Sequence, residues 1–337
     1  MDRHSNLAYA AYADLISSLR DEQVAAIMGT PRLEERNGRR YWYDVHRIGS
    51  SVRKRYIGED DDQTRARIER HSELAARQAE AAKDRQRLIR LLRAEGFQSL
   101  DPSTGAMLSA LARAGTFRLG GTLVGTVAFR HYEGELGIRM RQTDILNTGD
   151  IDIAQFERLS LTLCDTVAEP LATAFAGLDF APVPTLDGQS VWRWRQSRSN
   201  MQIEFLTPSF RPEEDIRDLP ALGVSAQSLH YLNYLIADPI KAAALYRSGV
   251  LIQIPRPERF AIHKLIVADR RRGGPDQIKS RKDRAQAAFL IRILSEDRPD
   301  DLRDAWEDAR SRGTRWQARI DASLARMPDT AALLAAL

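Results

Sequence analysis

Apolar and polar positions divide the first third of the chain into three segments. The pattern predicts a helix over Asn6–Met28 and, from two alternating aromatic runs around Gly49, a β-hairpin over Arg39–Ile57. The stretch 59–95 is dense in Glu, Arg, Gln and Ala and has few apolar positions before its end, which predicts a long, solvent-exposed helix. Its apolar end, Leu88–Phe97, is expected to dock this helix onto the next part of the chain.

The central part of the chain alternates between the spacing of apolar residues typical of helices and that typical of strands. A helix over Asp101–Ala114 is expected to lead into a short strand, Thr116–Leu119. Gly120-Gly121-Thr122 then separates this strand from a second predicted helix, Leu123–His131. Further strands are predicted over 150–154, 191–195 and 202–206, with a hairpin inside 245–254.

Helical spacing dominates from Pro257 to the last residue. For a core of mixed strands and helices that is followed by a helical stretch, we expect the α+β class. We divide the chain into four regions: 1–58, a helix and a basic aromatic hairpin; 59–95, a long charged helix; 96–255, the mixed core; and 256–337, a helical domain.

Composition sets broad limits on the kind of protein. The 337 residues are 43% hydrophobic, enough for an ordinary globular core, and one cysteine allows no internal disulfide. There is no apolar run of membrane-spanning length and no signal-peptide pattern, so we expect a cytoplasmic protein with no membrane contact. The net charge of +4 permits contact with nucleic acid but does not require it.

Three acids are the candidate catalytic and metal-binding residues. Asp150 and Asp152 lie two apart on a predicted strand, so both carboxylates point to one face, as suits a hard divalent cation. Glu204 is a single acid inside an apolar strand, where a buried charge needs a partner or a metal. An acid two residues from another acid is common by chance, and a strand acid that faces solvent is the alternative for Glu204.

The Gly-Gly-Thr turn is the candidate nucleotide-binding segment. Gly120 and Gly121 have no Cβ and allow a triphosphate to approach the backbone, while the following helix turn directs free N–H groups at the anion. Thr122 adds a hydroxyl at the same place. A tight turn that needs glycine only for packing is the alternative interpretation.

Together these motifs resemble the DNA polymerase beta-type nucleotidyltransferase superfamily, whose signature is a glycine pair, a later Asp-x-Asp and a third acid on a neighbouring strand. The chain resembles, more narrowly, a bacterial group of nucleotidyltransferase-fold proteins. The segments that carry the likeness are LGGTLVGT (119–126), TGDIDIA (148–154), IEFLTP (203–208) and PERFAIHKLIVADRR (257–271). An aspartate is commoner than Glu204 at the third position, and the gap between Gly121 and Asp150 is longer than usual.

The resemblance implies a mixed-sheet nucleotidyltransferase core with helical N-terminal and C-terminal regions. It implies that Asp150, Asp152 and Glu204 hold magnesium, or manganese in its place, against a nucleoside triphosphate. A nucleoside monophosphate would pass to a hydroxyl on an RNA such as tRNA, or on a protein, and pyrophosphate would leave. Lys264 would contact the phosphates. A toxin–antitoxin system is one biological setting for this activity.

Several alternatives stay open at this point. The chain is alternatively a catalytically inactive nucleotide- or nucleic-acid-binding protein of the same fold. Lys264 is equally well explained as a lysine that extends from a core helix to solvent. Lys279, Lys282 and Asp283 resemble a Lys-Asp pair of related toxin-type transferases, but surface ion pairs at a helix start are the favoured interpretation. The aromatic residues of the hairpin either stack on bases or pack on the Leu7–Ile16 helix, and we slightly favour the packing. The long charged helix is compatible with a homodimer.

Overall fold

The computed structural model describes most of the chain. The described residues are 2–22, 30–36, 39–48, 51–140, 150–162, 166–185, 188, 190–273 and 276–337. The centre of the predicted hairpin turn, the single cysteine and most of the segment before Asp150 lie outside these ranges. No helix in the described ranges has the length and apolar character needed to cross a membrane.

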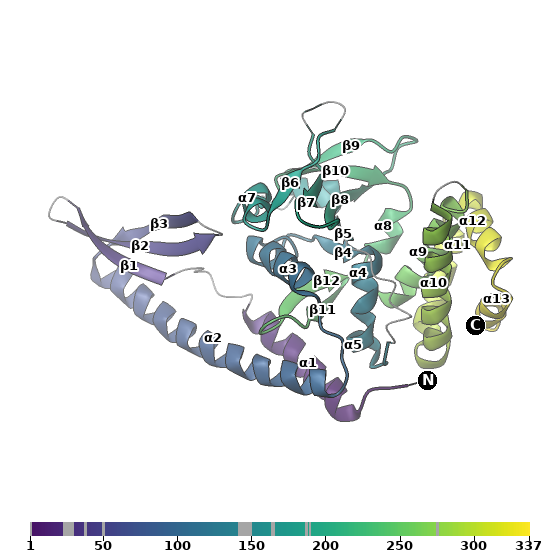
Figure 1. The fold of residues 1–337 in the computed structure, drawn as a ribbon, viewed down its shortest axis with the longest axis horizontal. Helices are drawn as coiled ribbons and strands as arrows, with labels where there is room; N and C mark the ends of the chain where they lie inside the picture. The colour runs from purple at the N-terminus through teal and green to yellow at the C-terminus, as the bar shows by residue number, and fades with distance from the viewer. Residues whose placement is uncertain are drawn as a thin grey trace.

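A mixed seven-stranded sheet forms the centre of the molecule (Figure 1). Its main path runs β4-β5-β8-β10-β9, and β7 pairs with both β8 and β6. β5 and β10 are parallel to β8, whereas β4, β7 and β9 pair antiparallel with their neighbours. The strands are β4 Thr122–Val124, β5 Asp150–Ala154, β6 Phe180–Pro182, β7 Arg193–Gln196, β8 Gln202–Pro208, β9 Ile216–Leu219 and β10 Val224–Leu229. The α+β class and the mixed sheet expected from the sequence are therefore confirmed.

The core on one face of this sheet is built from the apolar residues that alternate with the acids. Ile151, Ile153 and Ile203 are fully buried, as period-two alternation requires. Phe205 packs edge-on against Trp194, with ring centroids 5.5 Å apart. Short helices connect the strands: α3 Pro102–Ala114, α4 Gly125–Arg130, α5 Tyr132–Leu136, α6 Glu157–Thr162, α7 Leu171–Ala176 and α8 Leu232–Leu235.

The segment around the glycine pair differs from its prediction. Residues 116–119 form turns instead of the expected strand, and the strand β4 follows Gly120-Gly121. The helix begins at Gly125, directly after β4, and not after the glycine pair. The cause is local: the two glycines close a tight turn, with a hydrogen bond of 2.9 Å from the Gly121 amide to the Thr116 carbonyl.

A C-terminal bundle of helices covers one end of the sheet (Figure 1). α9 is its central member, because it packs against α10, α11 and α12 and buries most of its residues. The hairpin of β11 Ile240–Ala244 and β12 Val250–Ile254 precedes it, with β12 contacting β4. The helices are α9 Pro257–Arg270, α10 Gln277–Asp297, α11 Pro299–Ser311, α12 Thr314–Leu324 and α13 Pro328–Ala335.

The N-terminal helix and the long charged helix pack together beside the core. α1 (Asn6–Glu22) and the end of α2 (Asp62–Ala94) share a second apolar cluster with the β11–β12 hairpin. Ile89, Leu92 and Phe97 are buried there, so the predicted docking of the apolar end of α2 is confirmed. Asp61 caps the start of α2 by accepting a hydrogen bond of 2.7 Å from the Thr64 amide.

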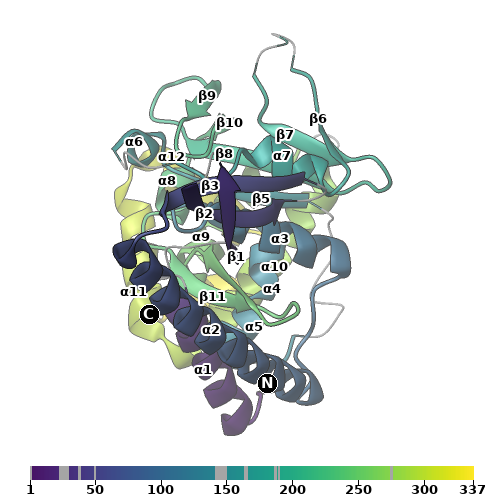
Figure 2. The same cartoon turned by 90° about the vertical axis from the view of Figure 1, so that its left-hand side faces the viewer.

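The N-terminal sheet lies at the far end of α2, apart from this body in Figure 1 and in front of it in the view of Figure 2. It contains β1 Thr30–Arg36, β2 Arg39–Ile48 and β3 Ser51–Glu59, in the order β1-β2-β3. The predicted hairpin is present as β2 and β3, and β1 adds a third strand. The favoured packing of its aromatic residues on the N-terminal helix is wrong, because α1 packs on α2 and on the β11–β12 hairpin, while the sheet contacts the start of α2.

Candidate acidic site

Pairing between β5 and β8 brings the three predicted acids to one face of the sheet. The strands run parallel with Asp152 in register with Glu204, and Asp150 lies two residues before Asp152. Registered residues and residues two apart share a face, so all three carboxylates face the same side. All three are half-buried, whereas the isoleucines between them are buried on the other side.

The three carboxylates are close enough to affect one another's protonation. Burial, together with the charges of Glu204 and Asp150, raises the pKa of Asp152 to about 7. Burial also raises the pKa of Glu204; nearby Arg193 opposes this rise, and Asp150 adds to it. Within the described residues, neither Asp150 nor Asp152 has a hydrogen bond or an ion pair that would offset this repulsion. The carboxylates therefore repel one another, and nearby Lys264, Arg271 and Lys279 offset this repulsion only in part, since both pKa values stay raised.

Glu204 has one cationic neighbour on the adjacent strand. Arg193 on β7 is in register with Glu204, and its Nε lies 3.4 Å from Glu204 Oε1. The guanidinium also stacks on Trp192, with its central carbon 4.4 Å from the ring centroid. The contact with Glu204 is at the long end of the ion-pair range and is not bidentate, so it neutralises Glu204 only in part.

Gly125 is the residue that fits against Asp152, and the sequence reasoning missed it. Val124 pairs with Asp152 across β4 and β5, and the chain turns into α4 at the next residue. Gly125 has a left-handed φ of +71°, and a Cβ added there would overlap Asp152 Oδ2. The pattern Leu-Val-Gly-Thr before an apolar run carried the signal for this strand-to-helix turn.

Gly120, Gly121 and Thr122 lie at the opposite end of β4 from the acids. Thr122 pairs with Ala154, and its hydroxyl is buried and accepts a hydrogen bond of 3.0 Å from Gln253 Nε2 on β12. The same amide nitrogen donates to the Gly120 carbonyl at 3.3 Å. The structure thus ties this turn to β12 and does not bring it against Asp152; a nucleotide-binding role for it stays a prediction.

Lys264 belongs to a buried ion-pair network on the helical side of the site. It is 6% exposed, and its Nζ lies 2.5 Å from Asp283 Oδ1 on α10. Arg271 donates to the other oxygen of Asp283 at 2.8 Å. Burial alone would raise the pKa of Asp283, but Lys264 and Arg271 hold it below its usual value. Two cations thus share one carboxylate, so the network carries a net positive charge.

This network is electrostatically coupled to the acids. Lys264 and Arg271 both lower the pKa of Asp152, although burial and the other acids outweigh them. Lys282 is 8% exposed; burial and the charge of Lys264 lower its pKa to about 8, while Asp283 and Asp150 oppose this change. The expectation of surface ion pairs is confirmed for Lys279, whose Nζ lies 3.5 Å from Asp276 on the surface. It is wrong for Lys282 and Asp283, because α10 packs this part of its first turns against α9.

The acids match a divalent metal ion in chemistry but are not drawn together around a point. Among the residues with described positions, no group of three or more His, Cys, Asp or Glu side chains is placed to hold a metal ion. Three half-buried oxygen donors on one face are nevertheless the ligand type of magnesium or manganese, and a metal ion would displace the proton that Asp152 holds near neutral pH. A cation would also relieve the repulsion among the three acids.

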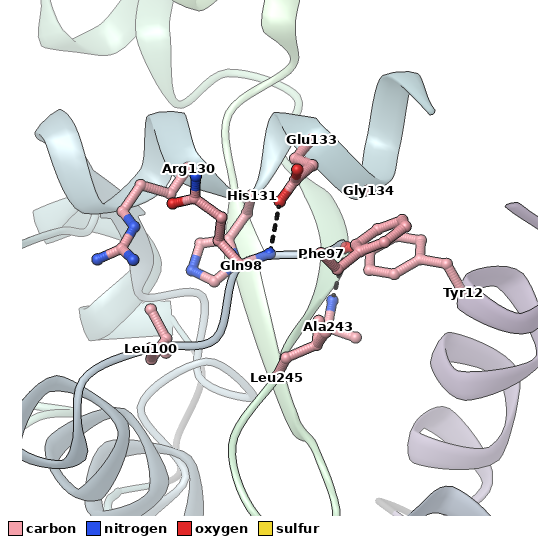
Figure 3. Close-up of a pocket in the computed structure, with 10 residues that line it drawn as sticks. All are labelled: Tyr12, Phe97, Gln98, Leu100, Arg130, His131, Glu133, Gly134, Ala243 and Leu245. Atoms are coloured by element: carbon pink, nitrogen blue, oxygen red, sulfur yellow. Dashed lines mark hydrogen bonds between the residues drawn. The ribbon is translucent and has the colours of Figure 1, made fainter. Parts of the chain in front are cut away.

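A small pocket beside α1 is separate from the acids. It lies between α1, the α4–α5 corner and β11, and includes Tyr12, His131 and Glu133 (Figure 3). Glu133 accepts a hydrogen bond of 3.1 Å from the Gln98 amide, and the Tyr12 hydroxyl accepts one from the Ala243 amide at 3.1 Å. Burial lowers the pKa of His131 to about 3, so this imidazole is neutral. These contacts join the core of the sheet to the apolar cluster of α1, α2 and the β11–β12 hairpin, and we assign the pocket a structural role.

Fold and site define an α+β protein with an acidic face on a mixed sheet, a glycine turn against it and cations opposite. A sequence model described as Nucleotidyltransferase matches residues 102–311, more than half of the chain, and the chain belongs to that family. The matched range contains the acids, Gly125, Lys264 and Asp283, but neither the N-terminal sheet nor α2.

Two further comparisons add little to this assignment. No curated protein matches the sequence. Among solved structures, the chain is similar to an antigenic nucleotidyltransferase-like protein from Paracoccidioides brasiliensis, with 11% sequence identity and a TM-score of 0.38 over 70% of this chain and 94% of that one.

Proposed function

We propose that this protein transfers a nucleoside monophosphate from a nucleoside triphosphate to a hydroxyl acceptor and releases pyrophosphate. The observation that carries the proposal is the register of β5 and β8, which puts Asp150, Asp152 and Glu204 on one face beside the Gly125 turn. Three facing carboxylates whose repulsion the nearby cations offset only in part are costly in a fold, and a bound cation accounts for that cost. Family membership supports nucleotidyl transfer in general.

Asp150, Asp152 and Glu204 are the residues that would hold the metal ions, magnesium or manganese. When bound, such ions polarise phosphate oxygens and lower the pKa of an attacking hydroxyl. The acids orient this chemistry on one face of the sheet, next to a backbone turn that has no side chain at Gly125. The register of Glu204 with Asp152 supports a role for this longer side chain beside the two aspartates.

The cationic network opposite the acids is suited to a triphosphate. Lys264 and Arg271 share Asp283, and Lys282 stands nearby with a lowered pKa. An incoming polyphosphate would gain charge-assisted contacts with these cations. In the transfer, the acceptor oxygen forms a bond to the α-phosphorus while the bond to the pyrophosphate oxygen breaks. The hydroxyl proton passes to a carboxylate of the site or to solvent.

Label transfer tests the proposal directly. The protein is incubated with each α-labelled nucleoside triphosphate, magnesium or manganese, and total RNA or total protein. We expect transfer from at least one triphosphate, lowered by a factor on the order of 10² or more in Asp150→Asn and in Asp152→Asn. Asp321→Asn is the matched control, because Asp321 is exposed and pairs only with Arg310 in the C-terminal bundle. Transfer that is equal in all four proteins, or absent from every combination, refutes the proposal.

An inactive nucleotide-binding protein is the second candidate. One observation favours it: Lys264 is already bound to Asp283, and Glu204 is 3.4 Å from Arg193, so two predicted site residues have protein partners. Calorimetry with magnesium and a non-hydrolysable triphosphate separates the two. Binding that is unaffected by Asp152→Ala, together with no transfer, identifies an inert binder.

A further inference from the structure

The positive charge of the chain is concentrated in the N-terminal sheet. Residues 30–59 contain eight Lys or Arg and four Asp or Glu, an excess of four positive charges that equals the excess of the whole chain. The three acids that follow, Asp60–Asp62, lie where the sheet meets α2, and Asp60 pairs with Arg40 of the sheet. The excess on the sheet away from this junction favours an anionic partner.

One face of the N-terminal sheet is fixed to the start of α2. Trp42 Nε1 donates a hydrogen bond of 2.8 Å to Asp60, and Arg40 lies 3.0 Å from the same carboxylate. Arg65, in the first turns of α2, binds it at 2.8 Å. Hydrogen bonds from Arg65 and Trp42 hold the pKa of Asp60 below its usual value. These contacts give the sheet a defined orientation on the helix.

The other face of the sheet combines arginines with tyrosines. Arg32 on β1 is in register with Tyr43 on β2, and Tyr41 and Arg39 lie two and four residues before Tyr43 on the same face. Arg32 and Arg39 are exposed, and both tyrosines are half-buried. The face also carries two acids in register with Tyr41, Glu34 on β1 and Glu59 on β3. Arg39 lies 3.9 Å from Glu59, an exposed and therefore weak ion pair. Arginines and aromatic rings on one sheet face suit a partner with both phosphates and flat bases.

We propose that this face of the N-terminal sheet binds RNA and presents it to the acidic site. The identification of the RNA as the acceptor rests on the proposed transferase function, whereas the binding itself does not. α2 has 33 residues, so it is about 50 Å long at 1.5 Å per residue, and it carries the sheet at its far end, beside the core and not packed on it (Figure 1). A folded RNA is large enough to contact the sheet and the acids at once. An acidic protein would also be attracted by the charge and is one outcome of the test below.

Binding of fluorescein-labelled mixed tRNA, followed by anisotropy at several salt concentrations, tests the proposal. The double variant Arg32→Ala/Arg39→Ala removes two exposed cations from the proposed face. We expect its Kd to rise about tenfold and the slope of log Kd against log salt to fall by about two, as for two lost phosphate contacts. The matched control is Arg315→Ala/Arg326→Ala, which removes two exposed arginines from the C-terminal bundle and should leave both quantities unchanged.

A second variant tests the aromatic contribution without changing the charge. Tyr43→Leu keeps an apolar side chain and should weaken binding of tRNA about tenfold with no change in the salt slope. Far-UV circular dichroism and the thermal midpoint check that each variant is folded. Heparin is a polyanion without bases. If Tyr43→Leu raises the Kd for heparin as much as the Kd for tRNA, stacking on bases is not involved and the assignment to RNA is overturned.

The outcomes separate this inference from the proposed function. Equal tRNA affinity in the wild type and in Arg32→Ala/Arg39→Ala overturns the RNA-binding surface, even if nucleotide transfer is observed. Loss of tRNA binding in that variant supports the surface, even if no transfer occurs and the transferase proposal fails. If the wild-type protein binds an acidic protein but has no affinity for tRNA, the surface is assigned to a protein partner and the inference is also overturned.

Discussion

The metal-free protein should become less stable as the pH rises towards 8, because of Asp152. Its pKa in the folded protein is about 7, against an ordinary value of 3.8. Between these two values the folded state keeps a proton that the unfolded state has lost. The stability associated with this proton is complete below pH 3.8 and is lost as the pH rises through about 7. Asp152→Asn removes the titration and with it this part of the pH dependence.

The size of the effect follows from the same values. Moving the pKa from 3.8 to about 7 corresponds to about 4 kcal/mol over the whole range. Asp152 is only half-buried, so solvent screening reduces this figure. We expect Asp152→Asn to gain about 2 kcal/mol in free energy of unfolding over the wild type between pH 5 and pH 8. The assay is thermal unfolding in EDTA at steps of pH, with Asp321→Asn as the exposed control.

Magnesium gives the same experiment a second readout. At pH 8 the added ion should raise the thermal midpoint of the wild type and of Asp321→Asn, and should have little effect on Asp152→Asn. If the metal-free wild type and Asp152→Asn keep a constant difference from pH 5 to pH 8, the three acids do not repel one another in the folded protein. The argument for a cation site would then be lost.

Three further predictions concern the surroundings of the acids. Gly125→Ala should lose at least about tenfold in transfer rate, because its Cβ displaces the Asp152 carboxylate. The control is Gly223→Ala, at a residue with a φ of +64° and open space around it. It should only lower the free energy of unfolding, by about 1–2 kcal/mol. Asp283→Asn should lower the free energy of unfolding by about 3 kcal/mol in a denaturant titration, since two cations lose their shared buried partner. In the same titration the exposed control Asp321→Asn should lose less than about 1 kcal/mol. Gln253→Leu should destabilise the protein by about 1–3 kcal/mol through the lost bonds to the Gly-Gly-Thr turn and leave the KM for triphosphate unchanged; a raised KM would instead indicate that this turn contacts the nucleotide.

Much of the sheet and its acids can be predicted because the signal is local. Alternation of acids with isoleucine over Asp150–Ala154 fixes both the strand and the face of its carboxylates, and the same holds for Glu204. The nearness of Glu204 to Asp152 is not local, since it depends on parallel pairing across a long connection. Only the family resemblance anticipated it.

The glycine turns show where local reasoning fails. Two adjacent glycines are a stronger sequence feature than one, and they led to the choice of Gly120 and Gly121 over Gly125. The deciding facts are the sign of φ at Gly125 and the position of Asp152 across the strand pair, and neither is visible in the sequence. Likewise, the sequence shows Asp283 only as a polar residue near a helix start, and the packing of α10 on α9 leaves it 1% exposed between Lys264 and Arg271.

The parallel pairing of β5 with β8 has a consequence for how relatives of this chain can diverge. The roughly 47 residues that connect the two strands include β7, which pairs with β8, but the turns between their helices and strands can lengthen or shorten at modest entropic cost, because loop closure depends only weakly on length. An insertion of one residue within β8 itself, before Glu204, would turn that carboxylate to the isoleucine side of the sheet. Natural variation in length should therefore gather in those turns and spare both β7 and the seven residues Gln202–Pro208.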